Sequence, residues 1–152
     1  LKKKLNSVSY TSISRQKLHS EKISNHVAII AKNKKLREIV NKVQKKIIKK
    51  NHRICVEGRD IASKILAKNP KYDVAFYFKC NLNIASHRRW IDLKKRIPLK
   101  DVKKSLKKRT ALDKKRKNSP LIKVKDAILI RTDKLNKKQV LSKMSEHIEK
   151  LN

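Results

Sequence analysis

Residues 73–80 read Asp-Val-Ala-Phe-Tyr-Phe-Lys-Cys, and every side chain from 74 to 78 is apolar or aromatic. A short continuous apolar run is typical of a strand in a parallel sheet, because such a strand is covered on both faces. Residues 126–131 contain a similar run from Ala127 to Ile130. We predict that both stretches are strands and that 73–80 is central.

Helical patterns surround these two strands. The spacing predicts helices over about 82–95 and 99–117, and a break where Pro120 follows Ser119. A final helix is predicted after 131, with apolar residues at helical spacing up to Ile148. Strands that alternate with helices predict an α/β fold with a parallel sheet.

The stretch upstream of residue 73 repeats this alternation. Apolar residues recur at helical intervals, which predicts one or two helices over 20–49 with Ser20 as a cap. Residues 53–57 are predicted to form a strand, followed by a helical stretch over 61–66. The first 17 residues show no sustained periodicity and are interpreted as a weak strand or an irregular arm.

The composition is strongly basic: the 152 residues carry a formal net charge of +32 and a pI near 10.5. Clustered cations favour phosphate-bearing partners such as nucleic acid. The joint abundance of lysine, asparagine and isoleucine also fits a coding bias, and this alternative stays open. With no apolar stretch near the roughly 20 residues of a membrane span and no secretory signal, a cytoplasmic location is expected.

Cysteine usage gives no sign of a metal site. Cys55 and Cys80 each stand in an apolar run, without the C-x-x-C spacing of zinc or redox sites. We interpret both as buried free thiols and expect no bound metal.

The sequence contains one glycine, Gly58, in Val-Glu-Gly-Arg-Asp directly after the predicted strand 53–57. A turn at the carboxyl end of a parallel strand usually faces a ligand. Arg59 would then grip phosphate and Asp60 would accept hydrogen bonds. The alternative is an ordinary turn glycine with Asp60 as a helix cap.

The predicted helix 99–117 carries Val102, Leu106, Arg109, Asp113 and Arg116 at steps of three and four residues, which places them on one stripe. Its arginines suit a phosphate clamp oriented by the aspartate. The alternative is a solvated helix with an ion pair worth about 0.3 to 0.5 kcal/mol.

The helix after the first strand carries His87, Arg88, Arg89 and Trp90. Adjacent arginines point in different directions, so one can meet nucleotide phosphate while the other faces solvent or a neighbouring helix. Trp90 is interpreted as a packing residue in preference to a base-stacking platform.

In this order and spacing, V-E-G-R-D-I-A, H-R-R, K-K-R-T-A-L-D-K-K-R-K-N-S-P-L and D-A-I-L-I-R-T resemble bacterial cytidylate kinase. Upstream, L-H-S-E-K-I-S-N and K-K-L-R-E fit the insert of that family that binds the nucleoside monophosphate. The resemblance covers about residues 18–150. It implies an incomplete P-loop nucleoside monophosphate kinase-like parallel sheet, with residues 1–50 as part of the insert, 51–152 as the C-terminal part of the core, and a lid over about 82–120.

The activity implied by the resemblance is transfer of the γ-phosphoryl group of ATP to CMP or dCMP, with Mg²⁺ bound through the nucleotide. Arg59, Arg109 and Arg116 then fall at positions that grip the CMP phosphate, with Arg109 and Arg116 also in the catalytic role and Asp113 supporting them. Arg37 and Asp60 fall where the family recognises cytosine and its sugar region. Arg88 and Arg89 fall where the lid approaches ATP. A monomer is expected.

The chain departs from the family pattern in one major respect: the phosphate-binding loop G-x-x-x-x-G-K-[ST] does not occur in it. Because that loop holds the β and γ phosphates, we expect a fragment that binds ATP poorly and catalyses little alone. Ala28, Ala62 and Arg131 replace a serine, a glycine and an acidic residue of the family. The alternative function is a basic nucleic-acid-binding protein without catalysis.

Overall fold

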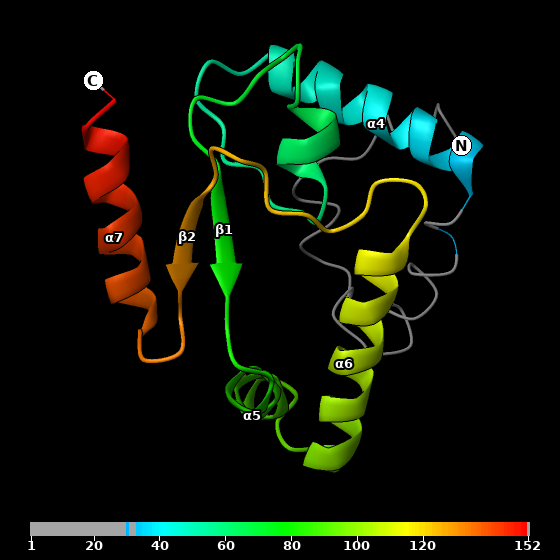
Figure 1. Cartoon of the computed structure of the whole chain (residues 1–152), viewed down its shortest axis with the longest axis vertical. Coiled ribbons are helices and arrows are strands. Elements are labelled where there is room, and N and C mark those ends of the chain that lie inside the picture. Colours follow the sequence, from blue (N-terminus) through cyan, green and yellow to red (C-terminus); the bar gives the residue numbers. More distant parts are fainter. Residues whose placement is uncertain (1–29, 31–32, 152) are drawn as a thin grey trace. The chain divides into compact units, whose positions relative to one another are not determined.

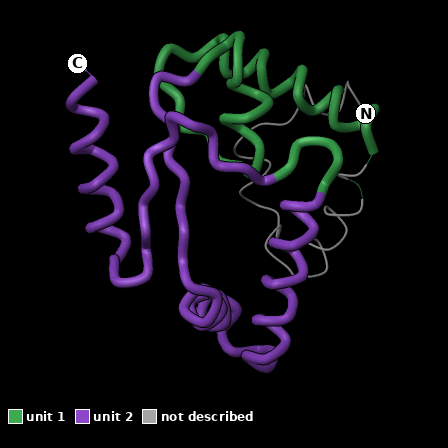
Figure 2. Tube along the Cα trace, in the orientation of Figure 1, with its two compact units in different colours: residues 1–71, 116–120 green, residues 72–115, 121–152 purple. Residues whose placement is uncertain are grey.

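The computed structural model describes residue 30 and residues 33–151. These residues divide into two compact units (Figure 2). The first unit takes in residues up to 71 together with 116–120, and the second takes in 72–115 and 121–152. The arm predicted for residues 1–17, the cap at Ser20, the helix predicted before residue 30 and Ala28 lie outside the described residues.

The second unit is built on a two-stranded parallel sheet (Figure 1). β1 (Phe76–Lys79) pairs with β2 (Ile128–Arg131), with Phe76 opposite Ile128 and Lys79 opposite Arg131. Backbone hydrogen bonds continue beyond both ends of the ladder, from Ile128 N to Ala75 O at 2.8 Å and from Thr132 N to Lys79 O at 2.9 Å. The two predicted strands and their parallel pairing are therefore confirmed, although each is shorter than predicted.

The prediction of a strand over residues 53–57 is wrong. These residues have no regular secondary structure, and Ile54 among them is 44% exposed. A strand needs a neighbour for its backbone N–H and C=O groups, and among the described residues the only ladder is that of β1 with β2. The apolar pattern alone predicted the strand, but no pairing partner for residues 53–57 occurs among the described residues.

Two helices of the second unit pack against each other: α5 (Leu82–Asp92) and α6 (Leu99–Lys115). Ser86 in α5 is 1% exposed and Val102 in α6 is 2% exposed. α5 ends three residues earlier than the predicted residue 95, because Lys94 and Lys95 adopt left-handed backbone conformations with φ of 54° and 56°. That backbone cannot continue a right-handed helix, so the chain turns towards α6.

Trp90 stabilises this turn. Its indole Nε1 donates a hydrogen bond to the carbonyl of Ile97 at 2.9 Å, and the Nζ of Lys95 lies 5.0 Å from the centre of its ring system. The ring of His87 is 5.7 Å away on the same helix. These contacts support the interpretation of Trp90 as a packing residue.

The last helix of the second unit, α7 (Lys137–Glu149), follows β2 and lies beside it (Figure 1). Its start is a capping box, in which the Asn136 side chain accepts from Gln139 N and the Gln139 side chain accepts from Asn136 N. The rings of His147 in α7 and Phe76 in β1 have centroids 6.2 Å apart. α7 thus packs onto the sheet as the apolar periodicity predicts.

The first unit consists of α4 (Lys34–Lys49) and a single π-helical turn, η1 (Ile61–Ile65). Asn33 caps α4 by accepting from Leu36 N at 3.1 Å. Ile48 of α4 and Ile65 of η1 are 8% and 1% exposed. The Nζ of Lys45 donates to the carbonyl of Asn69 at 3.3 Å, which ties α4 to the chain beyond η1.

Gly58 lies where a side chain would collide with η1. A Cβ added at this position would stand 2.7 Å from Cγ1 of Ile61. The close approach of Ile61, and not a left-handed backbone, is therefore what requires glycine here.

Cys55 is exposed and Cys80 is half-buried, so the expectation that both thiols are buried is wrong. The apolar run around Cys55 does not enter a sheet, and this leaves its side chain at the surface. Among the described helices, none combines the length and hydrophobicity needed to cross a lipid bilayer.

Candidate functional site

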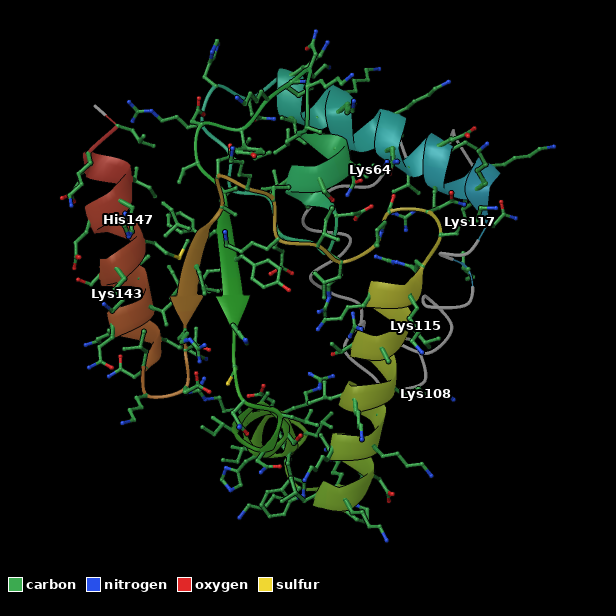
Figure 3. The ribbon with its side chains drawn as sticks, viewed as in Figure 1. Lys64, Lys108, Lys115, Lys117, Lys143 and His147 are labelled. Carbon is green, nitrogen blue, oxygen red and sulfur yellow. The ribbon has the colours of Figure 1, made fainter. Side chains whose placement is uncertain are left out.

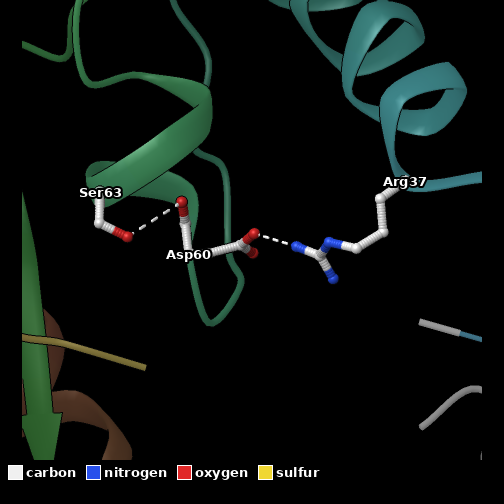
Figure 4. A network of polar contacts seen from close by, with 3 residues as sticks. All are labelled: Arg37, Asp60 and Ser63. Carbon is white, nitrogen blue, oxygen red and sulfur yellow. Dashed lines mark hydrogen bonds and ion pairs between the residues drawn. The ribbon is translucent and has the colours of Figure 1, made fainter. Parts of the chain in front are cut away.

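Arg37 and Asp60 form an ion pair that joins the two elements of the first unit (Figure 4). Nη2 of Arg37, on α4, donates to Oδ2 of Asp60, which directly precedes η1. The Arg37 and Asp60 side chains are only 15% and 13% exposed. A partly buried pair of this kind is shielded from the solvent screening that weakens surface ion pairs.

The backbone of Asp60 anchors η1 while its carboxylate stays available for Arg37. The carbonyl of Asp60 accepts from Lys64 N at 2.9 Å and from the Ser63 hydroxyl at 3.5 Å (Figure 4). Its side chain makes no capping hydrogen bond to the turn. The alternative interpretation of Asp60 as a helix-capping residue is therefore wrong. Single π-turns occur frequently at functional sites.

A basic cavity of about 190 Å³ opens beside this ion pair. Its lining comes from α4, from η1 and from the loop 116–120, all of which belong to the first unit. Four cationic side chains line it against one carboxylate, that of Glu38: Lys34, Arg37, Lys64 and Lys117. Figure 3 labels Lys64 on η1 and Lys117 in the loop. The cavity therefore suits an anion.

The loop 116–120 has an unusual backbone at the cavity. Ser119, which lines the cavity, has φ of 56° and is 6% exposed. Left-handed backbone at a residue other than glycine costs free energy and persists only where the surroundings impose it. The loop is closed by a hydrogen bond from Leu121 N to Asp113 O at 2.8 Å.

The predicted site residues are divided between the two units. The first unit holds Arg37, Arg59, Asp60 and Arg116, and the second holds Arg88, Arg89, Arg109 and Asp113. Arg59 is exposed and Arg116 is half-buried. Of the predicted set, Arg37 and Asp60 are brought into direct contact. The roles assigned to the eight residues remain predictions.

The stripe predicted along the helix after Pro98 lies on α6 as far as Asp113. Val102 is buried, Leu106 is half-buried, Arg109 is exposed and Asp113 is 8% exposed. A buried carboxylate is expensive unless it is paired or hydrogen-bonded. The burial of Asp113 contradicts the alternative of a fully solvated helix face, and its orienting role remains a prediction.

Arg88 holds the turn between β2 and α7. Its Nη2 donates to the carbonyls of Thr132 at 2.9 Å, Asp133 at 3.2 Å and Leu135 at 3.1 Å. Asp133 in the same turn accepts from Asn81 N at 2.6 Å, so the turn is also tied to the start of α5. The structure thus gives Arg88 a clear structural contact, and the ATP contact inferred from the resemblance remains a prediction.

Sequence reasoning missed the lysines that line the cavity. Lys34, Lys64 and Lys117 stand among 34 lysines, so residue type alone does not distinguish them. Their common feature is position in space, since they come from three separate segments. Only a tertiary structure shows that arrangement.

The second unit has a larger cavity, of about 350 Å³, between β2 and α7. It is lined by apolar atoms of Leu129 and Ile130 and by polar groups that include Arg131, Lys143 and His147 (Figure 3). None of the predicted nucleotide-binding residues lines it. Within the part of the chain that the structure describes, no cluster of three or more histidine, cysteine or acidic residues could hold a metal ion.

Comparison with known proteins agrees with the motif order. The cytidylate kinase family model matches residues 3–150. The cytidylate kinase of Caldanaerobacter subterraneus subsp. tengcongensis is 33% identical over 131 residues, which are 84% of this chain and 57% of that protein. The cytidylate kinase of Clostridium botulinum strain Okra is also 33% identical over 131 residues, which are 84% of this chain and 58% of that protein.

A third relative is the bifunctional pantoate ligase/cytidylate kinase of Prochlorococcus marinus strain NATL1A, with 32% identity over 133 residues, 85% of this chain and 25% of that protein. The match to the two cytidylate kinases thus spans somewhat more than half of their length. The family model, in contrast, matches nearly every residue of the chain, and the parallel β1–β2 pair with flanking helices agrees with a partial P-loop kinase fold. The chain therefore belongs to the cytidylate kinase family.

Proposed function

We propose that this chain serves the transfer of the γ-phosphoryl group of ATP to CMP or dCMP, giving ADP and the corresponding diphosphate, as a monomer in the cytoplasm. Its contribution is to bind the acceptor nucleotide. The observation that carries the proposal is the partly buried Arg37–Asp60 pair beside a basic cavity, within a chain of the cytidylate kinase family. Residues 1–50 contribute to the acceptor-binding insert and 51–152 to the core, with the lid over about 82–120.

The Arg37–Asp60 pair has the chemistry to distinguish cytosine from uracil. The edge of cytosine offers an exocyclic amino group as a donor and ring acceptors beside it, whereas uracil offers a carbonyl in place of the amino group. The carboxylate of Asp60 accepts from the amino group, and the guanidinium of Arg37 donates to the neighbouring acceptors. Because the two groups are already paired in the structure, little ordering is needed when the base arrives.

Phosphate binding falls to Arg59, Arg109 and Arg116. A planar guanidinium makes bidentate hydrogen bonds to phosphate that an ammonium cannot reproduce. Catalysis of phosphoryl transfer consists largely of positioning and electrostatic stabilisation, so arginines on the acceptor phosphate can serve both binding and reaction. Asp113 orients Arg109, on the same helix, and Arg116, which follows the end of that helix.

The sequence contains fewer of the groups that bind ATP, the phosphate donor, than of those that bind the acceptor. Arg88 and Arg89 are proposed to approach ATP, and Mg²⁺ arrives bound to that nucleotide. No G-x-x-x-x-G-K-[ST] loop occurs in the 152 residues, and such a loop supplies the backbone amides and lysine that hold the terminal phosphates. We therefore expect the isolated chain to bind CMP selectively but to transfer phosphate slowly.

The test is calorimetric titration of the chain with CMP, AMP and a short duplex DNA at low and high salt. CMP affinity that exceeds AMP affinity supports an acceptor site. Equal affinity for the two monophosphates, or no binding of either, contradicts it.

One observation favours a second candidate, binding of nucleic acid. The face of α6 away from Val102 carries a row of exposed lysines at positions 100, 104, 107, 108 and 115. Figure 3 labels Lys108 and Lys115 of this row. Such a row matches a phosphate backbone, whose binding weakens steeply as salt rises. Tight, salt-sensitive DNA binding without a CMP response would favour this candidate over the kinase acceptor site.

A further inference from the structure

We infer that Lys64 and Lys117, together with Lys34, form a phosphate-binding subsite beside Arg37. This inference rests on the proposed function, because it assigns a phosphate contact within the same acceptor unit. Lys34 and Lys117 stand within the quoted motifs and Lys64 does not, but the resemblance assigns no role to any of the three. Their role is additional to that of the arginines.

The first argument is convergence. Lys34 begins α4, Lys64 belongs to η1 and Lys117 lies in the loop 116–120, yet all three line one cavity with Arg37. Lysines on one amphipathic helix are expected to share a solvated face. Lysines from three separate segments that face one cavity need another explanation, because like charges repel at short range.

The second argument is charge balance. Four cations and a single carboxylate, Glu38, line the cavity. The ammonium groups of Lys34, Lys64 and Lys117 make no hydrogen bond or ion pair with another described residue. Arg37 is already paired with Asp60, so an anion in the cavity would offset the charge of the three lysines.

The third argument is size. A volume of about 190 Å³ is below the roughly 300–1,000 Å³ of pockets that enclose drug-sized ligands. It suits one tetrahedral oxyanion more closely than a whole nucleotide. Polar groups of Asn118 and Ser119 also line the cavity and can donate to phosphate oxygens.

The fourth argument is the backbone of the loop. Ser119 lines the cavity with φ of 56° and a side chain that is almost fully buried. Backbone strain at an observed outlier is a common mark of ligand-binding loops. The strained residue follows Lys117 by two positions and so helps to fix where that lysine lies.

The experiment compares the wild-type chain with the double variant Lys64→Gln/Lys117→Gln. Titrations use CMP, cytidine and inorganic phosphate, so that binding of a nucleotide phosphate and binding of free phosphate are measured separately. The double variant should lose about tenfold in affinity for CMP and for phosphate, whereas cytidine affinity should not change. High salt should reduce the difference between the two proteins.

A matched control is Lys68→Gln/Lys71→Gln. Both residues are exposed lysines of the first unit that do not line the cavity, and the change in net charge is the same. If both double variants lost the same affinity for CMP and phosphate, general electrostatic attraction would explain the loss, and the subsite would be overturned. Circular dichroism and thermal unfolding check that both variants fold.

The outcomes separate this subsite from the proposed function. Selective CMP binding that does not respond to the lysine substitutions would overturn the subsite and leave the acceptor site standing. Lysine-dependent phosphate binding without preference for CMP over AMP would support the subsite and contradict the acceptor site. Absence of binding to all ligands would overturn both.

Discussion

Nη2 of Arg37 donates to Oδ2 of Asp60, a residue 23 positions further along the chain. The bond fixes α4 against the start of η1, and of the two residues Arg37 lines the basic cavity. Each side chain is more than four-fifths buried, so each depends on the other to offset the loss of hydration. The pair is therefore both a structural link and the centre of the proposed base-binding site.

The first prediction concerns this pair. Asp60→Asn should lower CMP affinity about tenfold and the free energy of unfolding by about 1 to 3 kcal/mol, because the Arg37 charge loses its partner. Calorimetry and urea unfolding measure the two effects. Glu57→Gln, at an exposed neighbouring carboxylate, is the control and should change neither. An unaltered CMP affinity in Asp60→Asn would remove Asp60 from the base-binding site.

The second prediction concerns the phosphate clamp. Arg109→Ala and Arg116→Ala should each weaken CMP binding by about 1.5 to 3 kcal/mol, the range for hydrogen bonds to charged groups. Cytidine binding should change much less, since cytidine lacks the phosphate. Arg96→Ala, at an exposed arginine between α5 and α6, provides the control. The assignment fails if CMP affinity is the same in both variants as in the wild type.

The third prediction concerns Arg88. Replacing it with lysine keeps the charge but removes the planar group whose Nη2 reaches the carbonyls of Thr132, Asp133 and Leu135. Arg88→Lys should therefore lower the free energy of unfolding by about 1 to 2 kcal/mol and increase amide hydrogen exchange in the turn before α7. Unchanged stability and exchange would show that these contacts contribute little.

The sequence predicted the elements whose signals are local. The apolar runs in 73–80 and 126–131 identified β1 and β2, and the parallel pairing followed from the helices between them. Residues 53–57 also form a short apolar run but no strand. A strand needs a neighbouring strand to pair with, and the sequence of the segment itself does not show whether one is present. The same limit applies to Cys55, whose exposure follows from the missing pairing.

The family resemblance predicted part of the candidate site from the sequence, and the roles of these residues remain predictions. Arg37 and Asp60 were singled out through the family resemblance, and the structure places them in contact. The lysines of the cavity could not be found this way, since lysine is the common surface residue of the chain. The π-turn at 61–65 was also not specified, because a helical pattern this short does not distinguish an α-turn from a π-turn.

The fourth prediction concerns Tyr72, which donates a hydrogen bond to Oδ1 of Asp126 at 2.6 Å. This hydrogen bond to the carboxylate, together with desolvation and charge repulsion from Asp126, raises the pKa of Tyr72 from 10.0 to about 12. Folding therefore favours the neutral phenol. The contribution to stability is fully present below pH 10, and is lost as pH rises through the pKa of the folded state near 12.

The test compares urea unfolding of the wild type and Tyr72→Phe at pH 8 and at pH 11.5. At pH 8 the wild type should be more stable by about 1 kcal/mol or less, since the hydrogen bond is largely exposed to solvent. At the higher pH the difference should shrink as ionisation reduces the bond's contribution. Effects of pH that are common to both proteins cancel in the comparison. Tyr77→Phe serves as the control, and a difference independent of pH would contradict the raised pKa of Tyr72.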